Sequence, residues 1–231
     1  MRIWAVIPAA GIGLRYRSTI PKQYLSLCGM PVVLHSIDRL LEIEEIEEIF
    51  VVLSPQDTFW QNLDVAHPKL KTTLGGSERS QSVSLALKEL SCKAHEDDWV
   101  LVHDAVRPCV SQSDLQKLIE TIRNDDTGGL LAYPLSDTIK EVDNNSLSVR
   151  KTVARDELWS AMTPQMFKYG LLRKAYEETV LTGLSVTDEA SAIESLGLRP
   201  KIVQGEKANI KITHAEDMAL AESIIKARMG K

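Results

Sequence analysis

The segment IPAAGIGLR, residues 7–15, continues an apolar run that follows Arg2 and determines how the chain begins to fold. An uncharged run of this kind is typical of a strand buried on both faces of a parallel sheet. Gly11 and Gly13 then indicate a loop in which backbone N–H groups can approach a ligand closely. We therefore predict a buried strand, Arg2–Ile7, that leads into a glycine loop.

A signal peptide or a membrane span is the first alternative for this region, because Ile3 to Leu14 is uncharged and follows Arg2. Pro8 and the two glycines interrupt the run, however. Its twelve residues are also too few to cross a bilayer as a helix, which takes about 20. We expect neither a signal peptide nor a membrane-bound protein.

The rest of the chain alternates short apolar runs with segments of helical periodicity. Strands are expected at Arg2–Ile7, Ile49–Leu53, Lys71–Leu74, Trp99–Val102, Gly129–Tyr133, Ile202–Gln204 and Asn209–Ile212. Helices are expected at Pro31–Leu41, Ser77–Leu90, Ser111–Arg123, Tyr169–Leu181, Thr187–Leu196 and Thr213–Met229, the last with Glu216 completing a capping box. This alternation predicts an α/β fold with a doubly wound, mainly parallel sheet, in a single domain spanning residues 1–231.

One stretch breaks the alternation and reads as a β-hairpin. Thr138–Val142 and Ser148–Val153 flank Asp143-Asn144-Asn145, whose asparagines tolerate the positive φ of a hairpin turn. Charged residues such as Lys140 and Arg150 place this hairpin outside the core. We interpret residues 136–155 as a projecting arm, with a solvated loop insertion as the alternative.

Composition limits the possible partners and the compartment. The chain has 27 basic and 32 acidic residues, a net charge of −5, and only 5% aromatic residues, which argues against nucleic-acid binding. Its cysteines, Cys28, Cys92 and Cys109, share no close spacing, so neither a disulfide framework nor a zinc site is expected. We therefore expect a cytoplasmic protein in which Cys109 is a buried structural residue.

The glycine loop matches neither of the two common nucleotide motifs. A dinucleotide fingerprint would need a third glycine where Tyr16 stands and an acidic residue where Ser54 stands. An ATP-type phosphate loop fails because Tyr16 and Arg17 occupy the glycine and lysine positions. What remains is a loop followed by Arg15 and Lys22, two cations that could neutralise departing pyrophosphate, or else a tight turn with two solvated cations.

Other predicted strand ends favour the polyphosphate site. Asp104 follows the strand Trp99–Val102, where a carboxylate can bind a metal or hydroxyl groups, and we interpret its neighbour His103 as a supporting residue rather than a ligand. Gly75-Gly76 leads to Arg79 and Ser82 at a helix start, suited to a base or phosphate. Lys211 and Thr187 stand at two further element ends.

The chain resembles the 2-C-methyl-D-erythritol 4-phosphate cytidylyltransferases of the non-mevalonate isoprenoid pathway. The matching blocks occur in family order over nearly the whole chain: AAGIGLR, PKQY, GGSERSQSV, VHDAVRP, DTIK, TVAR, TPQMF, TDEAS and NIKIT. The resemblance implies a Rossmann-like nucleotidyltransferase fold, a dimerisation arm and magnesium dependence. It also implies attack of a methylerythritol phosphate oxygen on the α-phosphorus of CTP, with release of pyrophosphate.

The resemblance also implies roles for individual residues. Arg15 and Lys22 would stabilise the transition state on the CTP phosphates, and Arg155 and Lys211 would position the substrate phosphate. The implied CTP pocket consists of Pro8, Ala9, Ala10, Gly11, Ile12, Gly13, Gly75, Gly76, Ser82, Asp104 and Ala105. The implied contacts to the sugar phosphate come from Asp104, Arg107, Thr138, Arg155, Thr163, Thr187 and Lys211. Mg²⁺ would be held mainly by CTP, with Asp104 as a candidate ligand.

Two other functions stay open. A pentitol-phosphate cytidylyltransferase would share the fold and the CTP loop, and a few hydroxyl contacts would decide between the substrates. A catalytically silent nucleotide-binding regulator is disfavoured by Arg15, Lys22 and Lys211, because a mere binder needs no cation aimed at a leaving group. Val106 departs from the family, which usually has alanine there, and bears on packing near the ribose.

Overall fold

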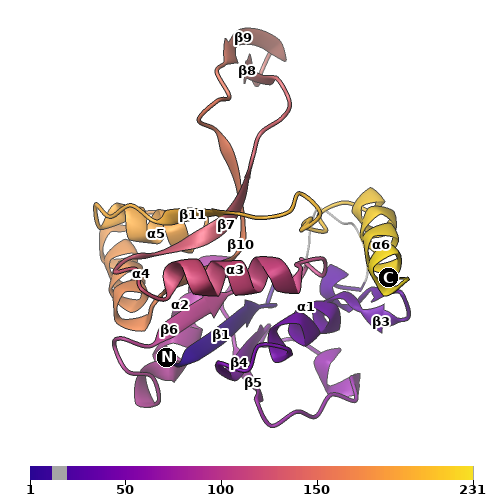
Figure 1. Ribbon diagram of the computed structural model, residues 1–231, viewed down its shortest axis with the longest axis vertical. Helices are drawn as coiled ribbons and strands as arrows, with labels where there is room; N and C mark the ends of the chain where they lie inside the picture. Colours follow the sequence, from indigo (N-terminus) through magenta and orange to yellow (C-terminus); the bar gives the residue numbers. More distant parts are fainter. Residues whose placement is uncertain (12–19, 231) are drawn as a thin grey trace.

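A computed structural model of the chain describes residues 1–11 and 20–230 (Figure 1). Among these residues, seven strands form one sheet in the order β11-β7-β10-β6-β1-β4-β5. Their bounds are β1 Ile3–Pro8, β4 Ile46–Leu53, β5 Leu70–Leu74, β6 Trp99–Val102, β7 Gly128–Pro134, β10 Trp159–Lys168 and β11 Lys201–Gln204. β10 runs antiparallel to both of its neighbours, and the other pairings are parallel. The predicted mainly parallel α/β sheet is therefore confirmed.

Helices cover both faces of this sheet. The six are α1 Val32–Leu41, α2 Arg79–Glu89, α3 Gln112–Ile122, α4 Tyr169–Thr182, α5 Glu189–Ser195 and α6 Glu216–Met229, within the described part of the chain. Alternate residues of β1 point to opposite sides: Ile3 and Ile7 pack with α1 and α3, whereas Trp4 and Val6 pack with α2, α4 and α5. The sheet is therefore doubly wound, as its uninterrupted apolar strands predict.

A third, smaller apolar cluster joins α6 to the sheet's edge region. It contains Val106, Cys109 and Ile212 together with residues of α6 and of the short hairpin β2 Ser26–Leu27 and β3 Met30–Pro31. Cys109 is fully buried, as predicted. This cluster anchors α6 behind the segment that carries Lys211.

Strand β10 was not predicted. Pro164 lies in its middle, and a proline is uncommon in a central strand. The structure accommodates Pro164 at a break in the ladder with β7, where the register shifts between Ala161 and Gln165. The residues on either side of this break pair normally with β7, and Gln165 to Lys168 also pair with β6.

Residues 209–212 do not form the strand expected at Asn209–Ile212. Their apolar alternation arises because Ile212 packs into the α6 cluster, not because the segment joins a ladder. The final helix begins at Glu216 rather than Thr213, and the expected capping box is absent. Instead the Asp217 carboxylate accepts hydrogen bonds from the backbone N–H groups of Thr213 and His214, both at 2.7 Å.

The predicted hairpin forms and projects from the body of the protein (Figure 1). It consists of β8 Ile139–Asp143 and β9 Ser148–Val153. Its positive φ falls on Leu147 rather than on an asparagine, because Asp143 Oδ1 accepts from the N–H groups of Asn145 and Ser146 and so shapes the turn. Over residues 1–11 and 20–230, no helix has the length and apolar character needed to cross a membrane.

Candidate active site

A cavity of about 490 Å³ opens at the carboxyl edge of the sheet, where β1 and β6 end. Ten residues that the sequence predicted for substrate contacts line it: Pro8, Ala9, Ala10, Gly11, Lys22, Gly76, Ser82, Asp104, Ala105 and Lys211. Gln23, Ser77, Glu78, Arg79 and Val106 also line it. The expectation that polar residues after separate strands meet at one edge is thus met.

The start of the glycine loop is held by a buried amide. Gln23 is 4% exposed, and its Nε2 donates to the carbonyl oxygens of Ala9 at 2.8 Å and Gly11 at 3.1 Å. Because Gln23 belongs to the 3-10 turn Lys22–Tyr24, these bonds fix Lys22 beside the loop. Lys22 Nζ donates to the carbonyl oxygen of Ile212 at 2.8 Å. The predicted site residues Ile12, Gly13 and Arg15 lie outside the described residues.

The second pair of glycines shapes the opposite wall. A Cβ atom on Gly75 would lie 2.7 Å from Ser82 Oγ and 2.8 Å from Ala10 Cβ, so only glycine fits without rearrangement. Ser82 Oγ accepts from the Gly76 N–H at 3.2 Å and donates to the carbonyl oxygen of Glu78 at 3.0 Å. The hydroxyl group of Ser82 therefore orders the start of α2 at the edge of the cavity.

Asp104 is the centre of a cluster of charged side chains. It is 5% exposed, and its Oδ1 accepts from Arg79 Nε at 2.9 Å. Its Oδ2 lies 2.8 Å from Lys211 Nζ and 3.4 Å from Arg107 Nε. Burial alone would raise the pKa of Asp104, but Arg79, Lys211 and Arg107 hold it well below its usual range. The carboxylate is therefore ionised and surrounded by cations.

Arg79 was predicted to suit a base or a phosphate; it lines the cavity, but its Nε, Nη1 and Nη2 each donate to a carboxylate of the protein. Besides Asp104, its guanidinium group forms a two-fold contact with Glu189, with Nη1 to Oε1 at 2.7 Å and Nη2 to Oε2 at 2.9 Å. Burial would lower the pKa of Arg79, but Glu189 and Asp104 raise it well above its usual value. Arg79 therefore bridges two carboxylates.

His103 supports the loop that carries Asp104. The carbonyl oxygen of Arg107 lies 3.1 Å from His103 Nε2, so this nitrogen carries the proton. His103 Nδ1 then accepts from the Thr163 hydroxyl at 3.1 Å, and the same hydroxyl accepts from the Asp104 N–H at 2.9 Å. Burial lowers the pKa of His103 to about 4. Thr163, predicted to meet the sugar phosphate, is itself 4% exposed, and its hydroxyl group forms both of these hydrogen bonds inside the protein.

The neutral state of His103 predicts a pH dependence of folding. Its folded pKa of about 4 lies below the ordinary 6.5, so between these values the unfolded chain binds a proton that the folded chain does not. The free energy of unfolding should therefore fall by about 2 kcal/mol from pH 7 to pH 5 through this group. Urea denaturation at both pH values should show a smaller loss of unfolding free energy for His103→Gln than for wild type. His67 is exposed, so His67→Gln is the control and should lose as much as wild type. A His103→Gln protein that loses as much as wild type would contradict the assignment.

Six of the predicted residues that the structure describes do not line the cavity of their own chain: Gly75, Arg107, Thr138, Arg155, Thr163 and Thr187. Arg155 and Thr138 are exposed near the foot of the arm, and Arg155 Nη1 donates to the carbonyl oxygen of Ser136. Thr187 is exposed just before α5, where its N–H donates to Ser191 Oγ at 3.1 Å. Arg107, by contrast, supports the cavity from behind, because its Nη1 donates to the carbonyl oxygen of Asn209 at 2.8 Å.

Sequence reasoning missed two residues that shape the site. Gln23 was part of a quoted block but received no role, although its position next to Lys22 was a usable signal. Glu189 likewise stood only inside the quoted block TDEAS, without a role; the signal was a carboxylate directly before the apolar positions Ala190, Ala192 and Ile193, all of which are buried. A charged residue on the buried face of a helix implies an internal partner.

Val106 lines the cavity with a side chain that is 7% exposed. It packs with Cys109 and Ile212 in the cluster under α6. The extra bulk relative to alanine is therefore accommodated between the cavity wall and α6.

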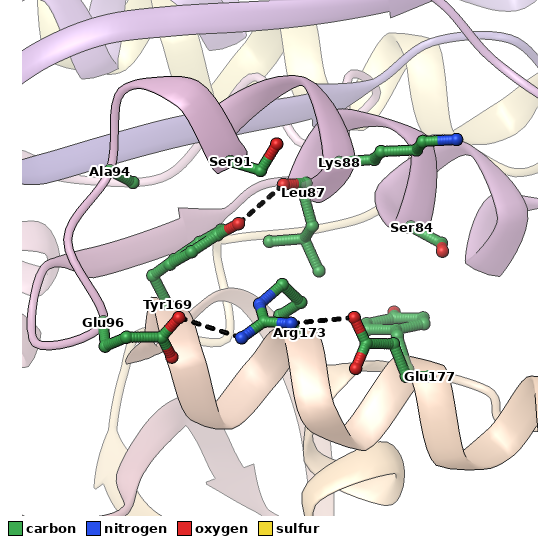
Figure 2. A pocket seen from close by; sticks show the side chains of 10 residues that line it. Ser84, Leu87, Lys88, Ser91, Ala94, Glu96, Tyr169, Arg173 and Glu177 are labelled. Atoms are coloured by element: carbon green, nitrogen blue, oxygen red, sulfur yellow. Dashed lines mark hydrogen bonds and ion pairs between the residues drawn. The ribbon is translucent and has the colours of Figure 1, made fainter.

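A second cavity, of about 420 Å³, lies between the end of α2 and the start of α4 (Figure 2). One of its two cations, Arg173, is paired with Glu96 at 2.8 Å and with Glu177 at 2.9 Å, and the Tyr169 hydroxyl donates to the carbonyl oxygen of Leu87. This second cavity includes Glu96, which precedes β6, so the cavity lies at the amino edge of the sheet. None of the predicted site residues lines it, so it is not the candidate site.

Comparisons with known proteins show which proteins this chain is similar to. The family model for IspD, 2-C-methyl-D-erythritol 4-phosphate cytidylyltransferase, matches residues 3–227. The chain is 46% identical over 230 residues to the 2-C-methyl-D-erythritol 4-phosphate cytidylyltransferase of Dechloromonas aromatica, covering 98% of this chain and 99% of that one. It is 44% identical to the Hahella chejuensis enzyme of the same name, covering 99% of this chain and 95% of the relative.

A solved structure extends the match to three dimensions. The crystal structure of Francisella tularensis 2-C-methyl-D-erythritol 4-phosphate cytidylyltransferase superposes with a TM-score of 0.85 at 38% identity. The superposition covers 97% of this chain and all of that one (100%). With the family match over residues 3–227, these likenesses show that the chain belongs to the 2-C-methyl-D-erythritol 4-phosphate cytidylyltransferase family.

Proposed function

We propose that this protein transfers CMP from CTP to 2-C-methyl-D-erythritol 4-phosphate, giving 4-diphosphocytidyl-2-C-methyl-D-erythritol and pyrophosphate. The observation that carries the proposal is the cavity in which Lys22, Lys211 and Asp104 meet the glycine loop, in a chain with relatives of that name. The enzyme would act in the synthesis of isoprenoid precursors.

The cavity suits phosphoryl transfer between two anions. The phosphate of the acceptor is already ionised at neutral pH, so its attack on the α-phosphorus of CTP requires no strong base. The difficulty is repulsion between the two phosphates, and cations placed beforehand reduce it. Lys211 is positioned by Asp104 and would hold the acceptor phosphate, while Lys22 would meet the charge that develops on pyrophosphate.

Mg²⁺ is proposed to enter with CTP. Among residues 1–11 and 20–230, no three potential ligand side chains gather, and both oxygens of Asp104 already face cations. Glu78 and Asp104 nevertheless line the cavity, which fits a magnesium site completed mainly by substrate phosphates. When bound, the ion would neutralise charge on the leaving pyrophosphate.

Pyrophosphate release with purified enzyme tests the proposal. Each of the four nucleoside triphosphates is combined with methylerythritol, ribitol or erythritol phosphate, with Mg²⁺ or with excess EDTA. We expect CTP and methylerythritol phosphate to give the highest turnover, and EDTA to abolish it. Equal rates with ATP or full activity in EDTA would contradict the proposal. Preference for ribitol phosphate would identify the pentitol enzyme, and no turnover would identify a silent binder.

We further propose a cytoplasmic homodimer that forms through the arm. Apolar side chains of the arm are exposed in the single chain: Val142 is 39%, Leu147 80% and Val149 58% exposed. A two-stranded hairpin without a core of its own is marginal unless it packs on a partner. The three cysteines, all within the described residues, are free, which supports a reducing compartment.

A further inference from the structure

Glu189 is a buried carboxylate for which the proposed mechanism has no use. It is 0% exposed at the first residue of α5, and it does not line the cavity at the carboxyl edge. Its Oε1 accepts from Arg79 Nη1 at 2.7 Å and from the Tyr176 hydroxyl at 2.9 Å, and its Oε2 accepts from Arg79 Nη2 at 2.9 Å. Both carboxylate oxygens are therefore fully engaged on one side of Arg79.

The contact with Glu189 restricts how Arg79 can approach Asp104. A guanidinium group is planar and rigid, so fixing Nη1 and Nη2 on Glu189 also fixes the direction of Nε. That Nε donates to Asp104 Oδ1 at 2.9 Å. The orientation of the Asp104 carboxylate thus depends on a residue in α5 that does not line the cavity.

The other oxygen of Asp104 holds a residue that lines the cavity. Asp104 Oδ2 lies 2.8 Å from Lys211 Nζ, and Lys211 belongs to the irregular segment 209–212, which no β-ladder holds in place. Without the Glu189 charge, Arg79 would be left with Asp104 as its counter-ion. The carboxylate would then turn toward Arg79 and away from Lys211.

We propose that Glu189 is a positioning residue: through Arg79 and Asp104, it places the Lys211 ammonium group where the acceptor phosphate binds. This inference rests on the proposed function for the identity of the acceptor. It concerns mainly the acceptor, because the contacts of Glu189 lead through Asp104 to the Lys211 side chain, whereas Lys22 is placed by the turn Lys22–Tyr24 and by the backbone carbonyl oxygen of Ile212.

The test compares Glu189→Gln with Glu194→Gln, an exposed glutamate on the same helix. Glu189→Gln should raise the KM for methylerythritol phosphate by about 10–100-fold, the range that loss of a supporting hydrogen-bond partner causes at metal sites. Its KM for CTP should stay within about threefold, because the glycine loop is held by Gln23 and the Gly75-Gly76 turn by Ser82, neither of which contacts Glu189. Glu194→Gln should match wild type. Equal loss for both substrates, or an unchanged KM for methylerythritol phosphate, would overturn the proposal.

Tyr176→Phe gives a milder form of the same test if Glu189→Gln does not fold. It removes the hydroxyl group that donates to Glu189 Oε1 and leaves Arg79 in place. We expect the same selective effect, with a smaller rise, about threefold, in the KM for methylerythritol phosphate. A folded Tyr176→Phe protein with equal losses for both substrates would point to a purely structural role.

Binding of inorganic phosphate separates this inference from the proposed function. Isothermal titration would compare wild type, Lys211→Ala and Glu189→Gln, with no turnover involved. We expect both variants to bind phosphate about tenfold more weakly than wild type. An inactive wild-type enzyme would refute the proposed function alone. If Lys211→Ala weakens phosphate binding but Glu189→Gln does not, the positioning role alone is refuted. The positioning role is also refuted if wild type does not bind phosphate.

Discussion

Replacing Lys22 by alanine is expected to lower kcat by roughly 10²–10³-fold, while the KM for CTP changes by less than about threefold. Lys22 lines the cavity, and its Nζ donates to the carbonyl oxygen of Ile212, next to Lys211. A cation at this place would interact more strongly with pyrophosphate as it departs than with bound CTP. Such a contact contributes to the transition state more than to the ground state.

Steady-state kinetics of Lys22→Ala, with CTP and methylerythritol phosphate varied in turn, measures this effect. Lys226→Ala is the matched control, because Lys226 is an exposed lysine of α6 whose partner is Glu222. It should retain the kcat of wild type. A Lys22→Ala enzyme with unchanged kcat and a raised KM would instead assign Lys22 to ground-state binding. Arg15→Ala is expected to behave like Lys22→Ala.

The parallel part of the fold could be predicted because its signal is local. The run Ile3–Ile7 is buried throughout, and a strand buried on both faces needs apolar residues at every position. The same reasoning failed at β10, where Pro164 is tolerated at a register break that only the neighbouring strand reveals. It failed again at Asn209–Ile212, where the apolar alternation reflects packing under α6.

The candidate site, too, could be predicted from the sequence only in part. Asp104 could be singled out because a polar residue after an apolar run points to the carboxyl edge of a sheet. Lys211 was assigned to that edge through a predicted strand that does not form, and only the family resemblance gave it a role. The role of Arg79 could not be predicted, because its partner Glu189 lies 110 residues away in the sequence. The apolar positions after Glu189 indicate that it needs an internal partner, but no local pattern says which element supplies that partner. Long-range charge pairing is therefore what the structure adds.

The arm raises the question of which chain Arg155 serves. Arg155 and Thr138 are exposed near its foot, and neither lines the cavity of its own chain. If two arms clasp in a two-fold dimer, each would carry its Arg155 to the cavity of the other subunit. We therefore predict that Arg155 acts in trans and that Arg155→Ala, like Lys22→Ala, is nearly inactive alone.

Mixing these two inactive variants should restore activity. Lys22→Ala and Arg155→Ala are unfolded together and refolded, so that random pairing makes about half of the dimers mixed. Each mixed dimer would contain one site with both defects and one with none, which returns about a quarter of the activity of refolded wild type. Lys22→Ala mixed with Lys211→Ala is the matched control: both residues line the cavity of one chain, so every site keeps a defect and the mixture should stay inactive. If the Arg155→Ala mixture is equally inactive, or if ultracentrifugation finds a monomer, Arg155 does not act in the neighbouring subunit, and its exposed position would need another function.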